Sequence, residues 1–242
     1  MEDQQALNYW RALVNFASRA GAEDTVNATP STISRLSEED IKWLQGAMSE
    51  FMKDNDPIRI MKQQLEKIVQ ALSAELTDKA GSEVLTALQT LIDLCYETDI
   101  ASDFLKIGGI RILPPLLASS QLDVQANAAE LVGVLCQNHP YCQKVLLDRD
   151  ILPLLLELLL RWPSVAVKAL FAVSCIVRGF NEGEKQFIEL NGFYYLVKIL
   201  ASNNERLLTK SSFLLSWLLQ KNEFKGECVL CQINLNYYCG DS

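Results

Sequence analysis

The sequence is poor in the residues on which most catalytic and metal sites depend. Its 242 residues include a single histidine, His139, which precedes Pro140 in what we interpret as a turn between helices. Nucleophilic catalysis of the Ser-His-Asp or Cys-His type needs a histidine beside the nucleophile, and structural zinc sites need four ligands. Phosphate-binding loops of the GxxxxGK[ST] or GxGxxG type do not occur. We therefore expect no catalytic residue, no cofactor and no metal, and predict that the chain is not an enzyme.

Positive charge is also scarce, because 22 Lys and Arg residues face 30 Asp and Glu residues. A net charge of −8 and an isoelectric point near 4.8 do not suit binding to nucleic acid or to an anionic membrane. The richest apolar run, residues 151–160, is much shorter than the roughly 18–20 residues of a membrane span. The first residues, MEDQQALNYW, show no signal-peptide pattern. We predict a cytoplasmic protein that binds another protein, with no nucleic acid and no membrane.

The seven cysteines are odd in number and lack the spacing of a disulfide framework. Three of them lie in apolar helical patterns, where a thiol behaves as a small hydrophobic side chain: Cys95, Cys136 and Cys175. Cys228 and Cys231 form one isolated CxxC pair. A zinc site there would need further ligands and a redox role would need a βαβ context, so thiols in a frayed tail are the better interpretation.

Composition and periodicity divide the chain into four segments. Residues 1–36 are expected to form an N-terminal helix and a flexible linker, and residues 37–80 to form capping helices that start at a capping box on Ser37. Residues 81–225 carry about four repeats, the last of them incomplete. The pattern stops at about residue 226, so residues 226–242 are expected to form a divergent, frayed tail, as in a truncated or alternatively spliced form.

Repetition is the dominant feature of residues 81–225. The segments VQANAAELVGVLCQ, VAVKALFAVSCIVR and LLTKSSFLLSWLLQ place Ala128, Ala169 and Ser211 at equivalent positions, 41 and then 42 residues apart. A helical period near 42 without strand patterns is typical of armadillo and HEAT repeats, in which stacked copies share one continuous core. The sequence therefore predicts an all-α fold, an armadillo-type right-handed superhelical solenoid with an N-terminal helical segment.

A second set of segments repeats in step with the first. GIRILPPLL, DILPLLLELL and GFYYLVKIL begin at residues 109, 150 and 192, which predicts that Leu113, Leu154 and Leu196 line one helix row. In the first copy, Pro114 and Pro115 fall where the other copies continue as helix. Because proline lacks an amide hydrogen and clashes with the preceding turn, this helix should start late or bend.

The segment VAVKALFAVSCIVR carries two stripes at helical spacing. One stripe consists of small and apolar residues and is expected to pack inward: Ala169, Ala172, Val173 and Ile176. Lys168, Phe171, Cys175 and Arg178 form a second stripe, displaced by roughly 100°. Aromatic and arginine side chains are typical anchors of protein recognition. The alternative is that both cations are solvated helix charges and that Phe171 packs between repeats.

Several segments resemble a known family. VKALFAVSCIVR (167–178), KQFIELNGF (185–193) and LTKSSFLLSWLL (208–219) are similar to repeats of the heat-shock-protein-binding protein one family. Its members are cytosolic armadillo-repeat nucleotide exchange factors of the seventy-kilodalton heat-shock chaperone. LIDLCYETDIASDFLKIGGI (91–110) resembles the first repeat of that family, and LVNFASRAGAED and LSEEDIKWLQGAMSEF resemble its N-terminal helical region. The resemblance covers most of residues 7–225.

The resemblance implies a partner, a mechanism and a set of contacts. Family members hold the ATPase domain of the chaperone in their concave face and promote ADP release. The resemblance places seven residues at that face: Ala101, Asn127, Glu130, Lys168, Phe171, Arg178 and Phe213. A small residue at position 101 would permit close approach, and the cations would meet carboxylates of the partner. The protein is expected to be a monomer.

Three alternatives stay open at the level of sequence. An armadillo adaptor for basic peptides would carry a ladder of Trp and Asn, whereas Glu130, Phe171 and Phe213 stand at the corresponding positions here. A hydrolase or metalloenzyme would need the histidines and loops that are missing. A relative of the secretory pathway would be expected to carry a signal sequence and a retention tetrapeptide, and neither pattern is found.

Overall fold

A computed structural model of the protein describes residues 42–43, 46, 56–73, 78–202 and 204–220. Contacts within the chain divide it after Asp56, and the second unit is described from Pro57 to Gln220. Every regular element in this described part is a helix, which confirms the predicted all-α class. The predictions for residues 1–36, for the capping box at Ser37, for the CxxC pair and for the tail 226–242 fall outside the described residues.

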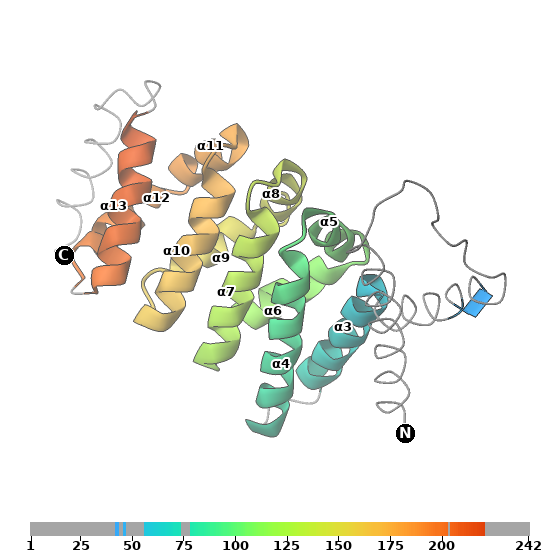
Figure 1. Ribbon diagram of the computed structural model, residues 1–242. Helices are drawn as coiled ribbons and strands as arrows, with labels where there is room; N and C mark the ends of the chain where they lie inside the picture. The colour runs from blue at the N-terminus through green and yellow to red at the C-terminus, as the bar shows by residue number, and fades with distance from the viewer. Residues whose placement is uncertain (1–41, 44–45, 47–55, 74–77, 203, 221–242) are drawn as a thin grey trace, which may run out of the picture. The chain divides into compact units, whose positions relative to one another are not determined.

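Three consecutive three-helix repeats occupy residues 98–220, and a helix pair precedes them (Figure 1). The pair consists of α3 (Pro57–Ser73) and α4 (Asp78–Cys95). The first repeat contains α5 (Thr98–Lys106), the 3-10 helix η1 (Gly109–Ile112) with α6 (Leu113–Leu117), and α7 (Leu122–Cys136). The second contains α8 (Pro140–Leu147), α9 (Ile151–Leu158) and α10 (Pro163–Val177). The third contains α11 (Asn181–Glu189), α12 (Gly192–Leu200) and α13 (Glu205–Gln220).

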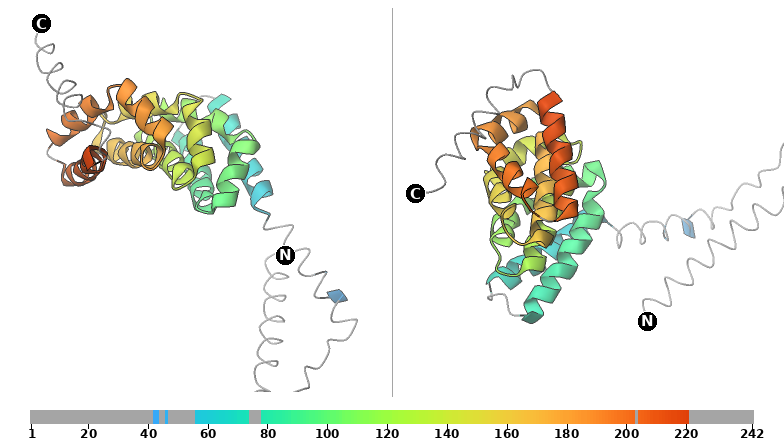
Figure 2. Two further views of the ribbon diagram at one scale, coloured as in Figure 1. Left: turned by 90° about the horizontal axis from the view of Figure 1, so that it is seen from above. Right: turned by 90° about the vertical axis from the view of Figure 1, so that its left-hand side faces the viewer.

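The last helix of each repeat joins one row. Helix α4 packs on α7, α7 on α10 and α10 on α13, so that these four helices lie side by side (Figure 1). The shorter helices of the repeats form a second layer behind this row (Figure 2): α5, α6, α8, α9, α11 and α12. Among the described helices, none is both long and apolar enough to cross a membrane.

The core between the layers follows the repeated sequence pattern. Ala128, Ala169 and Ser211 are all 0% exposed, as their equivalence predicts, and their small size lets neighbouring helices approach closely. The buried hydroxyl of Ser211 donates a hydrogen bond of 2.7 Å to the Leu207 carbonyl of its own helix, which offsets the cost of burying a polar group.

The turn before the second helix of each repeat shows which residues of the three repeats are equivalent. One residue in each of these turns has a left-handed backbone, with φ between 53° and 89°: Gly108, Asp150 and Asn191. Counting from these turns, the residue equivalent to Leu113 and Leu196 is Leu155 and not Leu154. Leu155 is fully buried and Leu154 only half-buried, so the prediction for Leu154 was wrong by one position.

The proline pair has the predicted effect. Residues 109–112 form a 3-10 turn, and the following α-helix begins at Leu113 with Pro114 and Pro115 in its first turn. The first amides of a helix have no partner within the helix, so prolines are tolerated there. The equivalent helices α9 and α12 have eight and nine residues, whereas α6 has only five.

Candidate protein-binding face

The exposed side of α4, α7, α10 and α13 is called the long-helix face below. Of the seven residues predicted to contact a partner, six belong to this row: Asn127 and Glu130 on α7, Lys168, Phe171 and Arg178 on or directly after α10, and Phe213 on α13. The stripe predicted to pack inward, including Ala169 and Ile176, is fully buried. The two predicted stripes are thus confirmed as the inner and outer sides of α10.

Ala101 does not lie on this face. It belongs to α5, in the layer of shorter helices, and is only 2% exposed. A methyl group in the core cannot let a partner approach closely, so the placement of Ala101 at the long-helix face has to be corrected. The resemblance identified the segment but gave no information about which side of the helix faces the core.

An ion pair links α7 to α10 at the centre of the long-helix face. Lys168 Nζ lies 2.6 Å from Glu130 Oε2, and the two side chains remain 40% and 21% exposed. Both side chains therefore reach solvent while holding each other in place. Asn127, one turn before Glu130, uses its amide differently and donates a 2.8 Å hydrogen bond to the Asp123 carbonyl of its own helix.

Cations and aromatic rings alternate between α10 and α13. The guanidinium of Arg178 lies 4.8 Å from the centre of the Phe213 ring and 6.0 Å from that of Trp217. The ammonium of Lys210 lies 5.6 Å from the centre of the Phe171 ring. Cation–π contacts of this kind hold long side chains in position and leave their hydrogen-bond donors free for a partner.

Phe171 packs between two repeats and is also partly exposed on the long-helix face. A side chain at Gly133 of α7 would collide with the Phe171 ring and approach the backbone of Ala172, so the glycine makes room for the aromatic ring between repeats. Phe171 is half-buried, whereas Phe213 on the next repeat is 57% exposed. The interpretation of Phe171 as an aromatic side chain between repeats is therefore confirmed.

Charge changes sign along the long-helix face. Helix α4 presents Asp93, whose carboxylate accepts a 2.9 Å hydrogen bond from Gln89, and α7 presents Glu130. The charged residues that the next two helices present at the corresponding stripe are all cations: Lys168, Arg178 and Lys210. A partner that covers the whole face would therefore meet a basic region beside an acidic one.

The described thiols are protonated at neutral pH. Burial raises the pKa of Cys95 and of Cys142 to about 12 and the pKa of Cys136 well above its usual range. Burial also raises the pKa of Cys175 to about 11, although the positive charges of Arg178 and Lys210 oppose that rise. Since the thiolate is the nucleophile, none of these cysteines is poised for catalysis.

His139 joins two repeats through its ring. It precedes α8, and its Nε2 lies 2.9 Å from Ser102 Oγ and 3.1 Å from the Thr98 carbonyl oxygen, both on α5. The predicted location in a turn between helices is confirmed, but the sequence gave no sign of the contacts to α5. Within the described residues, no three His, Cys, Asp or Glu side chains gather as metal ligands.

Comparison with known proteins assigns the family. The model of the SIL1/FES1/HPBP1 C-terminal domain family matches residues 100–228, more than half of the chain. The chain belongs to this family. The predicted resemblance is thereby confirmed, and the match runs from within α5 to the end of the third repeat, which includes the cations of the long-helix face.

Individual relatives extend over more of the chain. Hsp70-binding protein 1 of Rattus norvegicus is 36% identical over 236 residues, which cover 93% of this chain and 64% of that protein. The Hsp70 nucleotide exchange factor FES1 of Mycosarcoma maydis is 27% identical over 160 residues, 65% of this chain and 41% of that protein. The chain thus spans less than two thirds of the length of these relatives.

A solved structure confirms the type of repeat. The designed armadillo repeat protein YIII(Dq.V1)4CPAF, in complex with the peptide (KR)4, matches with a TM-score of 0.59 over 85% of this chain and 90% of its own. At 18% sequence identity this likeness concerns the fold alone. It confirms the predicted armadillo architecture.

Proposed function

We propose that this chain is a nucleotide exchange factor of a seventy-kilodalton heat-shock chaperone and that it binds the ATPase domain through the long-helix face. Two observations support the proposal together. The family includes proteins named for Hsp70 binding and for nucleotide exchange on Hsp70. The cations Lys168, Arg178 and Lys210 are held in an ordered array on the exposed side of α10 and α13, and this array is the observation that supports a contact at the face.

The cations would act on carboxylates of the chaperone. Arg178 rests on Phe213 and Trp217 and keeps its guanidinium donors available, so a carboxylate can bind it through two parallel hydrogen bonds. Lys168 already pairs with Glu130, so a partner carboxylate has to share or replace that contact. We expect Arg178 to contribute more to affinity than Lys168 for this reason.

Exchange follows from a difference in affinity between two states of the chaperone. A protein that binds the nucleotide-free ATPase domain more tightly than the ADP-bound domain must lower the affinity for ADP by the same factor. A rigid face of packed helices suits this role because it does not adapt to both states equally well. The function requires no bond to be formed or broken on this chain, in keeping with its protonated thiols.

Oligomeric state and location complete the proposal. The proposed complex contains one copy of this chain and one chaperone molecule, which a single continuous face allows. It works in the cytosol, where thiols stay reduced, and all four cysteines of the described part are free.

Recognition of basic peptides is the alternative function that an armadillo fold suggests. The array of Lys168, Arg178 and Lys210 would repel such a peptide from α10 and α13. An acidic partner surface suits the same array, so the alternative is not favoured.

Calorimetric titration of the chaperone ATPase domain tests the proposal. We expect tighter binding to the nucleotide-free domain than to the ADP-bound domain. The double variant Lys168→Glu/Arg178→Glu should weaken binding by roughly a hundredfold, because two attractive contacts become repulsive. Equal affinity for both nucleotide states would contradict the exchange mechanism.

A matched control separates the face from net charge. Lys106→Glu/Lys144→Glu changes the total charge by the same amount, at exposed positions of α5 and α8 in the layer of shorter helices. This control should bind like the unchanged protein. If it loses affinity as the first variant does, the contact is not at the long-helix face.

A further inference from the structure

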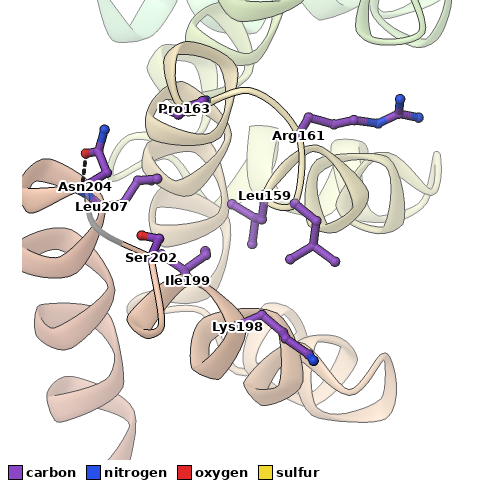
Figure 3. Close-up of a pocket in the computed structure, with 9 residues that line it drawn as sticks. Leu159, Arg161, Pro163, Lys198, Ile199, Ser202, Asn204 and Leu207 are labelled. Atoms are coloured by element: carbon purple, nitrogen blue, oxygen red, sulfur yellow. Dashed lines mark hydrogen bonds between the residues drawn. The ribbon is translucent and has the colours of Figure 1, made fainter. Parts of the chain in front are cut away.

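A pocket of about 450 Å³ opens at the junction of the second and third repeats (Figure 3). The turn between α9 and α10 forms one side, and the end of α12 with the start of α13 forms the other. Five apolar side chains line it: Leu159, Leu160, Pro163, Ile199 and Leu207. Arg161 and Lys198 stand at its rim with their charged ends directed away from the apolar lining.

The two rim cations are available to a ligand. Within the described part of the chain, neither Arg161 nor Lys198 forms an ion pair, and Lys198 lies 5.4 Å from the centre of the Tyr194 ring. These two residues place two positive charges beside one pocket of a chain whose net charge is −8. The same turn exposes two large apolar side chains, Leu160 at 49% and Trp162 at 64%.

The preceding junction carries different residues at the equivalent positions. Helices α7 and α10 begin 41 residues apart, so residues 159–161 correspond to Ala118, Ser119 and Ser120. The left-handed turns before α9 and α12 are also 41 residues apart, so Lys198 corresponds to Glu157. At these equivalent positions, only the second junction combines a leucine-rich lining with two cations.

We propose that this junction pocket binds a short extended segment of a partner protein in which an aliphatic or aromatic side chain lies beside a carboxylate. The apolar side chain enters the space between Leu160 and Ile199 and is removed from water there. Arg161 and Lys198 are exposed, so their side chains can turn toward the carboxylate and bind it through charge-assisted hydrogen bonds. Trp162 beside the rim adds the kind of exposed aromatic surface that is enriched at protein interfaces.

The pocket is remote from Arg178, although Lys210 follows the pocket residue Leu207 by three positions on α13. The pocket lies at the N-terminal ends of α10 and α13, whereas Arg178 follows the C-terminal end of α10. A rise of 1.5 Å per residue puts the two ends of this helix roughly 20 Å apart. A partner segment in the pocket would leave Arg178 accessible to another protein, and the proposal does not depend on the exchange function.

Fluorescence anisotropy of labelled peptides tests the proposal with the full chain. The probes are Gly-Ser peptides that carry one Leu, Ile, Phe or Trp between two Glu residues, and matched peptides carry Lys in place of Glu. We expect saturable binding of acidic probes and not of basic ones. The variant Arg161→Ser/Lys198→Glu copies the residues of the preceding junction and should weaken binding at least about tenfold.

Two controls make a failure informative. Leu160→Ser, which copies Ser119 at a half-exposed position, should also weaken binding while thermal unfolding stays unchanged. Lys106→Ser/Lys144→Glu changes net charge as the pocket variant does and should leave binding intact. Absence of binding by every acidic probe, or equal binding by basic probes, would overturn the proposal. So would self-association in sedimentation that the pocket variant abolishes, because the occupant would then be a second copy of this chain.

Discussion

The four cysteines of the described part are shielded from solvent. Cys95, Cys136 and Cys142 are buried and Cys175 is half-buried, and burial raises the pKa of each thiol above its usual range. A thiol whose folded-state pKa is raised stays protonated as pH passes the value of the unfolded chain, roughly 8.5. Its contribution to stability is complete below that pH and is lost as pH rises toward the folded-state value.

Thiol alkylation checks this at the residue scale. At pH 8 we expect iodoacetamide to modify these four cysteines at least about tenfold more slowly in the native chain than in urea, because little thiolate forms and access is blocked. Cys175 should react first, because it is only half-buried and its pKa of about 11 lies below those of Cys95 and Cys142. Peptide mapping by mass spectrometry measures each site. Rapid native modification of Cys136 would contradict its burial.

His139 supports a second prediction at this scale. Its ring bonds to Ser102 and to the Thr98 carbonyl, so His139→Ala should lower the free energy of unfolding by about 1 kcal/mol through lost hydrogen bonding. Lys144→Ala on the neighbouring helix removes only an exposed ion pair and should change stability by less than about 0.5 kcal/mol. Urea unfolding followed by circular dichroism compares the two. Equal effects would mean that the His139 contacts add nothing.

Which residues are buried could be predicted from sequence, but which residues touch could not. The helical period of the segment around Ala169 separates inner from outer positions because only one stripe is uniformly small and apolar. The contact of Arg178 with Phe213 joins residues of different repeats and depends on how α10 and α13 are rotated against each other. Ala101 was misplaced because a resemblance between segments does not say which side of a helix is covered.

At the scale of elements, the spacing of α7 and α10 depends on Gly133, which has no side chain. Gly133→Ala should lower stability by about 1 kcal/mol, because overpacking against Phe171 outweighs the better helix propensity of alanine. In a Phe171→Ala background the same change should no longer be destabilising. Urea unfolding of the four proteins gives this double-mutant cycle. An equal penalty in both backgrounds would show that the ring is not the obstacle.

Element boundaries explain two further outcomes of the sequence analysis. Period and proline positions predicted the late start of α6, because both are encoded locally. The register of α9 was mispredicted by one residue, since the repeats differ in length by one and the letters alone do not show where the extra residue lies. The left-handed turns at Asp150 and Asn191 settle that register. The junction pocket was missed for a related reason, because finding Arg161 and Lys198 requires comparing the correctly aligned copies turn by turn.

For the whole molecule, charge on the long-helix face sets the response of binding to salt. Affinity for the chaperone ATPase domain should fall by roughly tenfold between 50 and 500 mM NaCl, because salt screens exposed charges. The variant Lys168→Glu/Arg178→Glu should lose most of this dependence, and Lys106→Glu/Lys144→Glu should keep it. Calorimetry across the salt series measures the slopes. A slope that is the same in all three proteins would contradict a role for these cations.

If this chain promotes exchange by binding through the long-helix face, it must raise the rate of ADP release from the chaperone. A fluorescent ADP is preloaded on the chaperone and chased with excess ATP, with and without the chain. The account predicts faster release with the unchanged protein and with Lys106→Glu/Lys144→Glu, and release at the basal rate with Lys168→Glu/Arg178→Glu. Release that stays at the basal rate with the unchanged protein, despite measurable binding, would contradict the account.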